Sequence, residues 1–210
     1  MMYLLIFTVL YGLSPLFLVF YTKCWAKIKS FIPFTIVVFF ASSYEFVGSI
    51  LLKINVEYWF LLYGILSFFS IHFFFYFLLK KKFKTIFLFL IFGFILFFIY
   101  LAFKSFNLNY LTVSSFLKVY QTIVVLFFSI LWFKRVFEDL EFENLYDSAS
   151  FYFVSGLLIY YCGSVFLFLS ANSLYTNDKT NFQYYWILNI ILNLVLRTLM
   201  LVGIWKARQE

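Results

Sequence analysis

Charged residues are scarce in this chain, and their scarcity excludes a soluble globular domain. Of the 210 residues, only 12% are Asp, Glu, Lys or Arg, whereas about a quarter of the residues of a typical soluble domain are charged. Hydrophobic residues make up 65% of the chain and aromatic residues 27%. A soluble domain of this length could not cover its surface with so few polar groups. The composition is typical of a protein whose surface faces lipid.

Residues that bind metals or catalyse reactions are scarce as well. The chain has one histidine, His72, and two cysteines, Cys24 and Cys162, which lie far from one another in the sequence. They cannot build a zinc site, which normally needs three or four protein ligands. Glu45 is the one carboxylate that clearly falls inside an apolar run, which excludes catalysis by paired carboxylates there. The last apolar run has no lysine for a retinal Schiff base. The sequence therefore predicts a protein that is not an enzyme and holds no metal or cofactor.

Long apolar runs are the feature that the chain has in abundance. A helix needs about 20 apolar residues to cross the roughly 30 Å of hydrocarbon in a bilayer. Seven runs of about this length predict seven membrane-spanning helices, at 3–22, 31–53, 58–79, 85–103, 110–133, 150–171 and 184–205. The linkers are too short for a soluble domain. We therefore expect an all-α integral membrane protein, with residues 1–210 forming a single seven-helix domain.

The distribution of Lys and Arg predicts the orientation of this bundle. Eleven positive residues fall on one side of the predicted membrane: Lys23, Lys27, Lys29, Lys80, Lys81, Lys82, Lys84, Lys134, Arg135, Lys206 and Arg208. The other side has only Lys53, Lys104 and Lys179. Positive loops stay in the cytoplasm, so we expect the N-terminus outside and the C-terminus in the cytoplasm.

Polar residues inside the apolar runs are the candidates for a functional site, because they are costly in a bilayer. Counting along each run places a set of them in one slab around the bilayer centre: Glu45, His72, Lys118, Gln121, Tyr160, Tyr161, Asn193 and Arg197. The eight residues that we predict to form a ligand-binding site or polar core are Glu45, His72, Lys118, Gln121, Tyr160, Asn189, Asn193 and Arg197. A lone charge there costs about 2.5–3.5 kcal/mol on insertion scales, so we expect Glu45 to pair with Lys118. Two interpretations remain open. These groups either hold the helices together or line a cavity for a small ligand or ion.

Three of these residues recur at intervals of four in the last apolar run. Asn189, Asn193 and Arg197 therefore lie on one face of a helix, and we expect this stripe to face the bundle interior. Arg197 should contact a carboxylate, a backbone carbonyl, water or an aromatic face, unless it extends to the inner membrane surface instead. A histidine in the setting of His72 is more often packed or hydrogen-bonded than a ligand.

Three local features add to this prediction. Pro15 should kink the first helix, and Gly156 and Gly163, seven residues apart, indicate a face for close helix packing. The linker 134–149 is the only acidic patch and predicts either a solvated helix extension or a docking surface for a cytosolic partner. The membrane itself is the other partner, and nothing indicates nucleic acid, because the positive loops already account for the net charge of +7.

Three segments carry a resemblance to a known family. The segments are "YLTVSSFLKVYQTIVVLFFSILWF" (110–133), "FYFVSGLLIYYCGSVFLFL" (151–169) and "WILNIILNLVLRTLMLVGIWKAR" (186–208). They resemble a family of uncharacterised seven-helix inner-membrane proteins common in Bacteroidetes. Tyr152 stands where the family has tryptophan, and Lys118 where it has glutamate. The resemblance implies a multi-pass protein of the bacterial cytoplasmic membrane, often encoded beside sensor histidine kinases, and transfers no functional residue.

Together these observations predict a non-enzymatic sensory or regulatory membrane subunit. It has no output domain of its own, so it would act through a partner such as a histidine kinase. One alternative is a small channel or transporter with a polar site between the second, fifth and seventh helices. A further alternative is a scaffolding subunit of a larger membrane complex. A channel needs polar groups that continue to the inner mouth, whereas here they become sparse beyond Arg197, which favours a pocket closed on the inner side.

Overall fold

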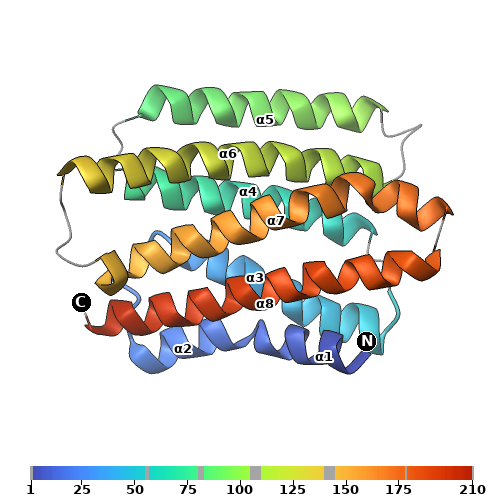
Figure 1. Cartoon of the computed structure of the whole chain (residues 1–210), viewed down its shortest axis with the longest axis horizontal. Coiled ribbons are helices and arrows are strands. Elements are labelled where there is room, and N and C mark those ends of the chain that lie inside the picture. The colour runs from blue at the N-terminus through green and yellow to red at the C-terminus, as the bar shows by residue number, and fades with distance from the viewer. Residues whose placement is uncertain are drawn as a thin grey trace.

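The chain folds into a bundle of helices that run roughly along a common direction (Figure 1). The computed structural model describes residues 2–54, 57–79, 83–104, 110–139, 145–177 and 179–209. In chain order the elements are α1 (Met2–Tyr11), α2 (Ser14–Thr22), α3 (Ile32–Tyr44), the π-helix η1 (Glu45–Leu51), α4 (Glu57–Leu78), α5 (Lys84–Lys104), α6 (Tyr110–Asp139), the single-turn helix η2 (Leu145–Asp147), α7 (Ala149–Asn177) and α8 (Lys179–Gln209). The two ends of the chain lie at opposite ends of the bundle (Figure 1).

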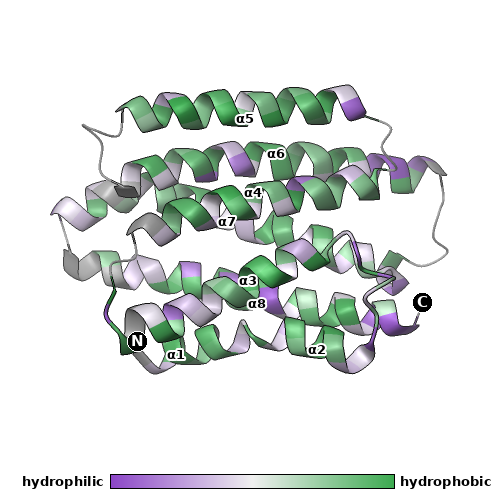
Figure 2. Cartoon of the chain, turned by 180° about the vertical axis from the view of Figure 1, so that it is seen from behind, coloured by the Kyte–Doolittle hydropathy of each residue, from purple (hydrophilic) through white to green (hydrophobic). Residues whose placement is uncertain are grey.

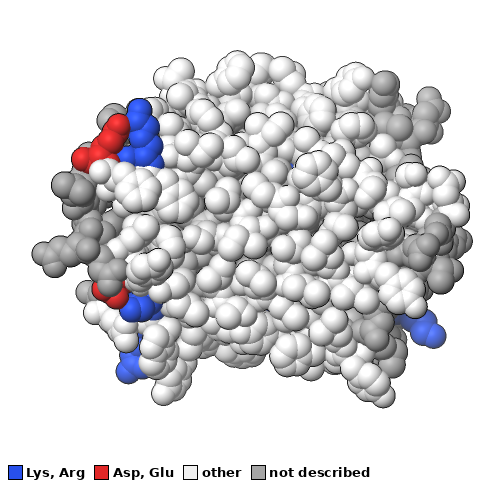
Figure 3. All heavy atoms as spheres, in the orientation of Figure 1, with Lys and Arg blue, Asp and Glu red and all other residues white. Residues whose placement is uncertain are grey.

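The helices have the length and composition of membrane spans. Six segments of the described chain are long and apolar enough to cross a bilayer, and Ile32–Gly48 is a shorter apolar helix. Apolar residues cover the helices along most of their length (Figure 2). On the face drawn in Figure 3, charged side chains lie at the two ends of the bundle and are absent between them. The chain is therefore a polytopic helical membrane protein, while its orientation in the membrane stays a prediction.

The first predicted helix is broken rather than merely kinked. It consists of α1 and α2, which are separated at Gly12 and Leu13. Pro15 lies in the first turn of α2, where its missing N–H is tolerated but the helix cannot continue back through it. The break therefore precedes the proline by a few residues. The side chain of Arg197, in α8, lies against this break.

The second predicted helix, at 31–53, is not α-helical throughout. It begins as α3 at Ile32, with Pro33 in its first turn, and changes at Glu45 into the π-helix η1. π-Helices are rare and occur often at functional sites. Glu45, the predicted intramembrane carboxylate, is the first residue of this segment.

Three helices extend beyond the predicted apolar runs. α6 continues to Asp139 rather than ending at 133, α7 continues to Asn177, and α8 begins at Lys179. The expected loop at 172–183 is thus almost entirely helical. Apolarity marks the part of a helix that lies in hydrocarbon, whereas backbone hydrogen bonding continues into water. Of the linker 134–149, the first part is this extension of α6, and residues 140–144 lie outside the described residues.

α7 and α8 form the most extensive helix pair of the bundle. A Cβ on Gly156 would lie 3.2 Å from Leu196 and Leu199, and one on Gly163 would lie 2.8 Å from Leu192. Both glycines therefore face α8 at close range, as expected from their spacing. α5, by contrast, lies at one edge of the bundle and packs only lightly against α4 and α6 (Figure 1).

The half of the bundle that contains the C-terminus is filled by aromatic packing. Phe31 at the start of α3 stacks on Phe153 at the start of α7, with ring centroids 4.0 Å apart, and Phe74 packs edge-on against Phe31 at 4.9 Å. Phe128 of α6 stacks on Phe87 of α5 at 4.2 Å. These side chains are almost completely buried. The core therefore closes this half of the bundle with apolar groups.

Candidate functional site

The other half of the bundle contains a cavity of about 280 Å³. Its walls come from α1, α3 with η1, α4, α6, α7 and α8, so that α5 alone among the long helices contributes nothing to it. The contributing residues come from α1, from the second half of α3 and the first residue of η1, from the first halves of α4 and α6, and from the central parts of α7 and α8. Because neighbouring helices run in opposite directions, these positions meet in one half of the bundle. Under the predicted orientation this is the outer half.

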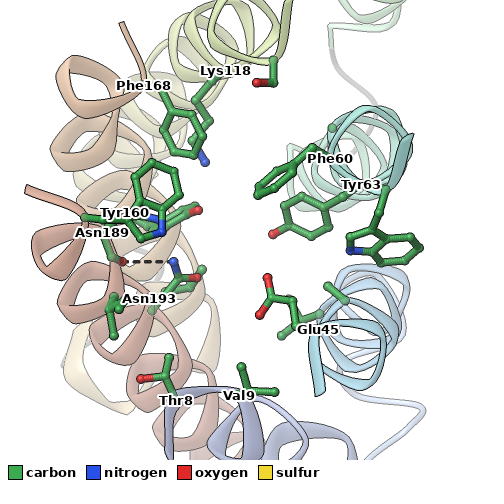
Figure 4. Close-up of a pocket in the computed structure, with 18 of the residues that line it drawn as sticks. Thr8, Val9, Glu45, Phe60, Tyr63, Lys118, Tyr160, Phe168, Asn189 and Asn193 are labelled. Carbon is green, nitrogen blue, oxygen red and sulfur yellow. Dashed lines mark hydrogen bonds between the residues drawn. The ribbon is translucent and has the colours of Figure 1, made fainter. Parts of the chain in front are cut away.

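Seven of the eight predicted polar residues line this cavity: Glu45, Lys118, Gln121, Tyr160, Asn189, Asn193 and Arg197. Lys118 points into the cavity from α6 and Glu45 from the far wall, with Asn193 of α8 between them (Figure 4). Aromatic side chains of α4 and α7 form the remaining walls, among them Phe60 and Phe168. The structure thus brings residues that are far apart in the sequence around one space.

The polar stripe of α8 faces inward, as expected. Asn189 and Arg197 are buried, with 7% and 5% of their surface exposed. The side-chain amide of Asn193 donates a hydrogen bond of 3.0 Å to the backbone carbonyl of Asn189 and also interacts with the hydroxyl of Tyr160. The side-chain oxygen of Asn189 is buried and has no hydrogen-bond partner among the described residues.

Arg197 does not extend toward a membrane surface. Its guanidinium donates one hydrogen bond to the backbone carbonyl of Thr8 in α1 and another, of 3.2 Å, to the hydroxyl of Ser42 in α3. The expectation that this arginine finds a backbone carbonyl inside the bundle is confirmed. Arg197 also interacts electrostatically with Glu45. It therefore joins α8 to the broken first span and to the helix that precedes Glu45.

The predicted ion pair between Glu45 and Lys118 is wrong. Within the described ranges, ion pairs are formed by Lys134 with Glu138 at 3.7 Å and by Lys206 with Asp147 at 2.9 Å, and not by these two residues. Lys118 instead lies over two aromatic rings, with its ammonium nitrogen 3.8 Å from the ring centre of Tyr160 and 3.9 Å from that of Tyr161. Equal depth in the bilayer did not imply contact, because the cavity separates α6 from η1.

Gln121 is a structural member of the wall. Its amide nitrogen donates to the backbone carbonyl of Gly64 and, at 3.3 Å, to the hydroxyl of Ser67, both on α4. Its hydrogen-bonding groups thereby tie α6 to α4. Of the two interpretations left open by the sequence, helix-to-helix bonding describes Gln121 well.

His72 lies outside the cavity, which corrects its inclusion in the predicted site. One ring nitrogen is 3.0 Å from the backbone carbonyl of Phe87 in α5. The ring packs against Phe68, Phe87 and Phe128, with centroids 4.8–5.6 Å away. His72 is thus a packed, hydrogen-bonded histidine that holds the peripheral α5 against α4. The depth predicted for His72 is close to that of the other polar residues, but His72 lies on the face of α4 that turns toward α5 and not on the face that turns toward the cavity.

Three residues that shape the site were not predicted from the sequence: Tyr63, Ser42 and Gly12. Tyr63 of α4 points its hydroxyl into the cavity opposite Tyr160 (Figure 4). Ser42 lies three residues before Glu45, and that spacing could have placed it on the same face. Gly12 lies at the break of the first span, where a Cβ would approach the guanidinium carbon of Arg197 to 2.7 Å. No sequence signal indicates that a glycine in one span accommodates an arginine in another.

The side chains around the cavity offer several kinds of contact to a small molecule. Across the part of the chain that is described, no group of three His, Cys, Asp or Glu residues could hold a metal ion. The cavity offers two cations, one carboxylate, amides, phenol hydroxyls and aromatic faces. Comparison with protein-family models, curated proteins and solved structures finds no match for this chain. The site itself is therefore the basis for a functional conclusion.

Proposed function

We propose that the chain is a non-enzymatic receptor or regulatory subunit that binds a small molecule inside the membrane and acts through a partner protein. The observation that carries this proposal is Lys118, a buried cation beside the cavity that forms no ion pair with any described residue. A lone charge in a bilayer is costly, and intramembrane ionisable groups usually serve a function. Gln121 holds helices together, but Lys118 joins no helix to another through an oxygen of the described chain.

The form of the cavity favours binding over transport. The polar residues that line the cavity extend no deeper into the bundle than Arg197. The half of the bundle beyond Arg197 is filled by buried residues such as Phe31, Phe74 and Phe153. A channel or transporter needs a path that can open to both sides, whereas a receptor needs only one opening. The packed half therefore supports a pocket closed on one side. A pure scaffold would have no use for a cavity with an uncompensated cation.

A route for passing on the bound state starts at Arg197. This residue touches the break between α1 and α2, and α2 continues from there toward the end of the bundle that carries Lys206 and the η2 segment. A ligand that changes the electrostatic interaction between Glu45 and Arg197 would also change the hydrogen bond by which Arg197 holds the first span at this break. We propose that the partner, a membrane or cytoplasmic protein such as a histidine kinase, contacts the segment 134–149.

Reconstituted protein can distinguish a receptor from a transporter. Small solutes would first be screened for a shift in melting temperature of the purified protein in nanodiscs. Each solute that binds would then be tested for entry into liposomes that contain the protein, beside empty liposomes. Binding without protein-dependent flux supports the receptor proposal. Saturable flux of a bound solute would show the transporter alternative to be right.

A further inference from the structure

The charges around the cavity are unevenly compensated. Arg197 has two hydrogen-bond acceptors and interacts with the charge of Glu45. Lys118 has neither an ion pair nor an acceptor oxygen among the described residues, although its ammonium carries three donors. Arg197 and Glu45 act on one another, whereas Lys118 has no opposite charge beside it among the described residues.

The surroundings of Lys118 hold its ammonium in place without neutralising it. The nitrogen lies over Tyr160 and Tyr161, and at 5.2 Å from the ring centre of Phe168. Aromatic faces attract a cation, each by about 0.5–2 kcal/mol, but accept no strong hydrogen bond. The residue is 6% exposed, and Figure 4 shows its amine directed into the cavity. The ammonium is thus fixed by α7 and presented to whatever occupies the space.

The rest of the lining has the composition expected for an amphipathic ligand. The aromatic side chains of Trp59, Phe60, Phe168 and Trp186 offer apolar walls, and Tyr63 adds a hydroxyl directed inward. The volume of about 280 Å³ is close to the lower end of the roughly 300–1,000 Å³ that is usual for ligand pockets. A small molecule with one charged group and an apolar part fits a cavity of this size and lining.

We infer that the cavity binds a small organic monoanion, with its anionic group on the ammonium of Lys118 and its apolar or aromatic body against the walls. This inference rests on the proposed function and names the class of ligand. A buried cation becomes favourable when an anion pairs with it in a medium of low dielectric constant. The carboxylate of Glu45 on the far wall keeps the anionic group at the Lys118 side by repulsion.

Two sources could supply such a group: a free organic acid that enters from outside, or an anionic lipid whose phosphate and upper acyl chain enter from the bilayer. The recognition chemistry at Lys118 is the same for both. The experiment therefore uses one matched set of soluble probes and one pair of lipids. Hydrocinnamate, hydrocinnamyl alcohol and phenethylamine share a phenyl body and differ in charge. Phosphatidylglycerol is anionic, and phosphatidylcholine has no net charge.

The protein would be placed in phosphatidylcholine nanodiscs, and binding would be measured from the change in intrinsic tryptophan fluorescence, because two of the five tryptophans, Trp59 and Trp186, line the cavity. We expect hydrocinnamate to bind at least about tenfold more tightly than either analogue, since a close charge pair contributes this much or more. Lys118→Met should remove the preference for the acid. Lys134→Met is the matched control, because Lys134 lies on the same helix but is exposed, and it should leave the preference unchanged.

The lipid arm would measure co-purification from mixed bilayers by native mass spectrometry. Retention of phosphatidylglycerol that depends on Lys118, with weak binding of hydrocinnamate, supports the inference with lipid as the source. Tighter binding of phenethylamine, or equal binding of acid and alcohol, would overturn the anion inference and leave the receptor proposal standing. If neither the soluble probes nor a wide solute screen nor lipids bind, both the inference and the proposed function fail.

Discussion

Arg197 of α8 donates a hydrogen bond to the backbone carbonyl of Thr8 in α1, one turn before the first span breaks at Gly12. The two residues are 189 positions apart in the chain. The same carbonyl accepts the N–H of Gly12 at 3.0 Å. A charge that would be costly in lipid is thereby used to join the last helix to the break in the first.

Gly12→Ala tests this packing. The added methyl group would meet the guanidinium of Arg197 and the hydroxyl of Ser42 at less than van der Waals distance, and overpacking of this kind typically costs about 1–3 kcal/mol. We expect a lower melting temperature in detergent. Gly64→Ala is the control, since its Cβ would lie 3.7 Å from a side-chain carbon of Leu117, at ordinary van der Waals distance. Equal melting temperatures for the two variants would contradict the close fit of Arg197.

Arg197→Leu should destabilise the fold strongly. It leaves the carbonyl of Thr8 and the hydroxyl of Ser42 without this donor and removes the cation that acts on Glu45. Breaking one side of a buried charge interaction costs about 3–5 kcal/mol. Chemical denaturation in mixed micelles would measure the free energy of unfolding. The double variant Arg197→Leu with Glu45→Gln should recover part of the loss, and strict additivity would show that the two charges are uncoupled.

Lys118→Met should have the opposite effect on stability. Methionine keeps an unbranched side chain that packs well against aromatic rings, and it removes an uncompensated buried charge. We expect the free energy of unfolding to rise by about 1–3 kcal/mol, while binding of the anion is lost. Lys134→Met should change stability by less than about 0.5 kcal/mol. A clear loss of stability in Lys118→Met would mean that this lysine holds the bundle together.

Two described side chains, those of His72 and Tyr120, form hydrogen bonds to the backbone of the peripheral helix α5. His72 of α4 bonds to the carbonyl of Phe87, and the hydroxyl of Tyr120 in α6 donates to the carbonyl of Leu90 at 2.8 Å. His72→Phe and Tyr120→Phe keep the aromatic packing and remove one bond each, worth about 0.6 kcal/mol in membranes. Hydrogen exchange should become faster in α5 and stay unchanged in α7 and α8. Unchanged exchange in α5 for the double variant would show that packing alone holds this helix.

The orientation predicted from the lysines can be tested by labelling single cysteines in intact cells. Thr176 near the end of α7 and Lys84 at the start of α5 are both exposed and lie on opposite sides of the predicted membrane. In a background without Cys24 and Cys162, an impermeant maleimide should label Thr176→Cys and leave Lys84→Cys unlabelled until the cells are opened. The reverse labelling pattern would show that the bundle has the opposite orientation in the membrane.

The sequence by itself determined that this is a helical membrane protein and where six of its seven predicted spans lie, because the length of an apolar run is set by bilayer thickness. The second predicted span, 31–53, contains a shorter apolar helix, Ile32–Gly48. It also determined that the face of Asn189, Asn193 and Arg197 turns inward, since helical spacing and the lack of polar partners in lipid suffice for that. These properties depend on neighbours along the chain and on the solvent. Helix ends such as Asp139 and Asn177 were not determined, because a helix continues past the hydrocarbon boundary without any change in its backbone.

Only the tertiary structure decided which polar groups meet. Residues at one depth share a slab, but the angle at which each helix faces its neighbours decides contact, and apolar packing over the whole bundle sets that angle. His72 therefore faces α5 rather than the cavity, and Lys118 lies over Tyr160 and Tyr161 rather than beside Glu45. Arg197 reaches Thr8 because Gly12, in a distant span, has no side chain to exclude it.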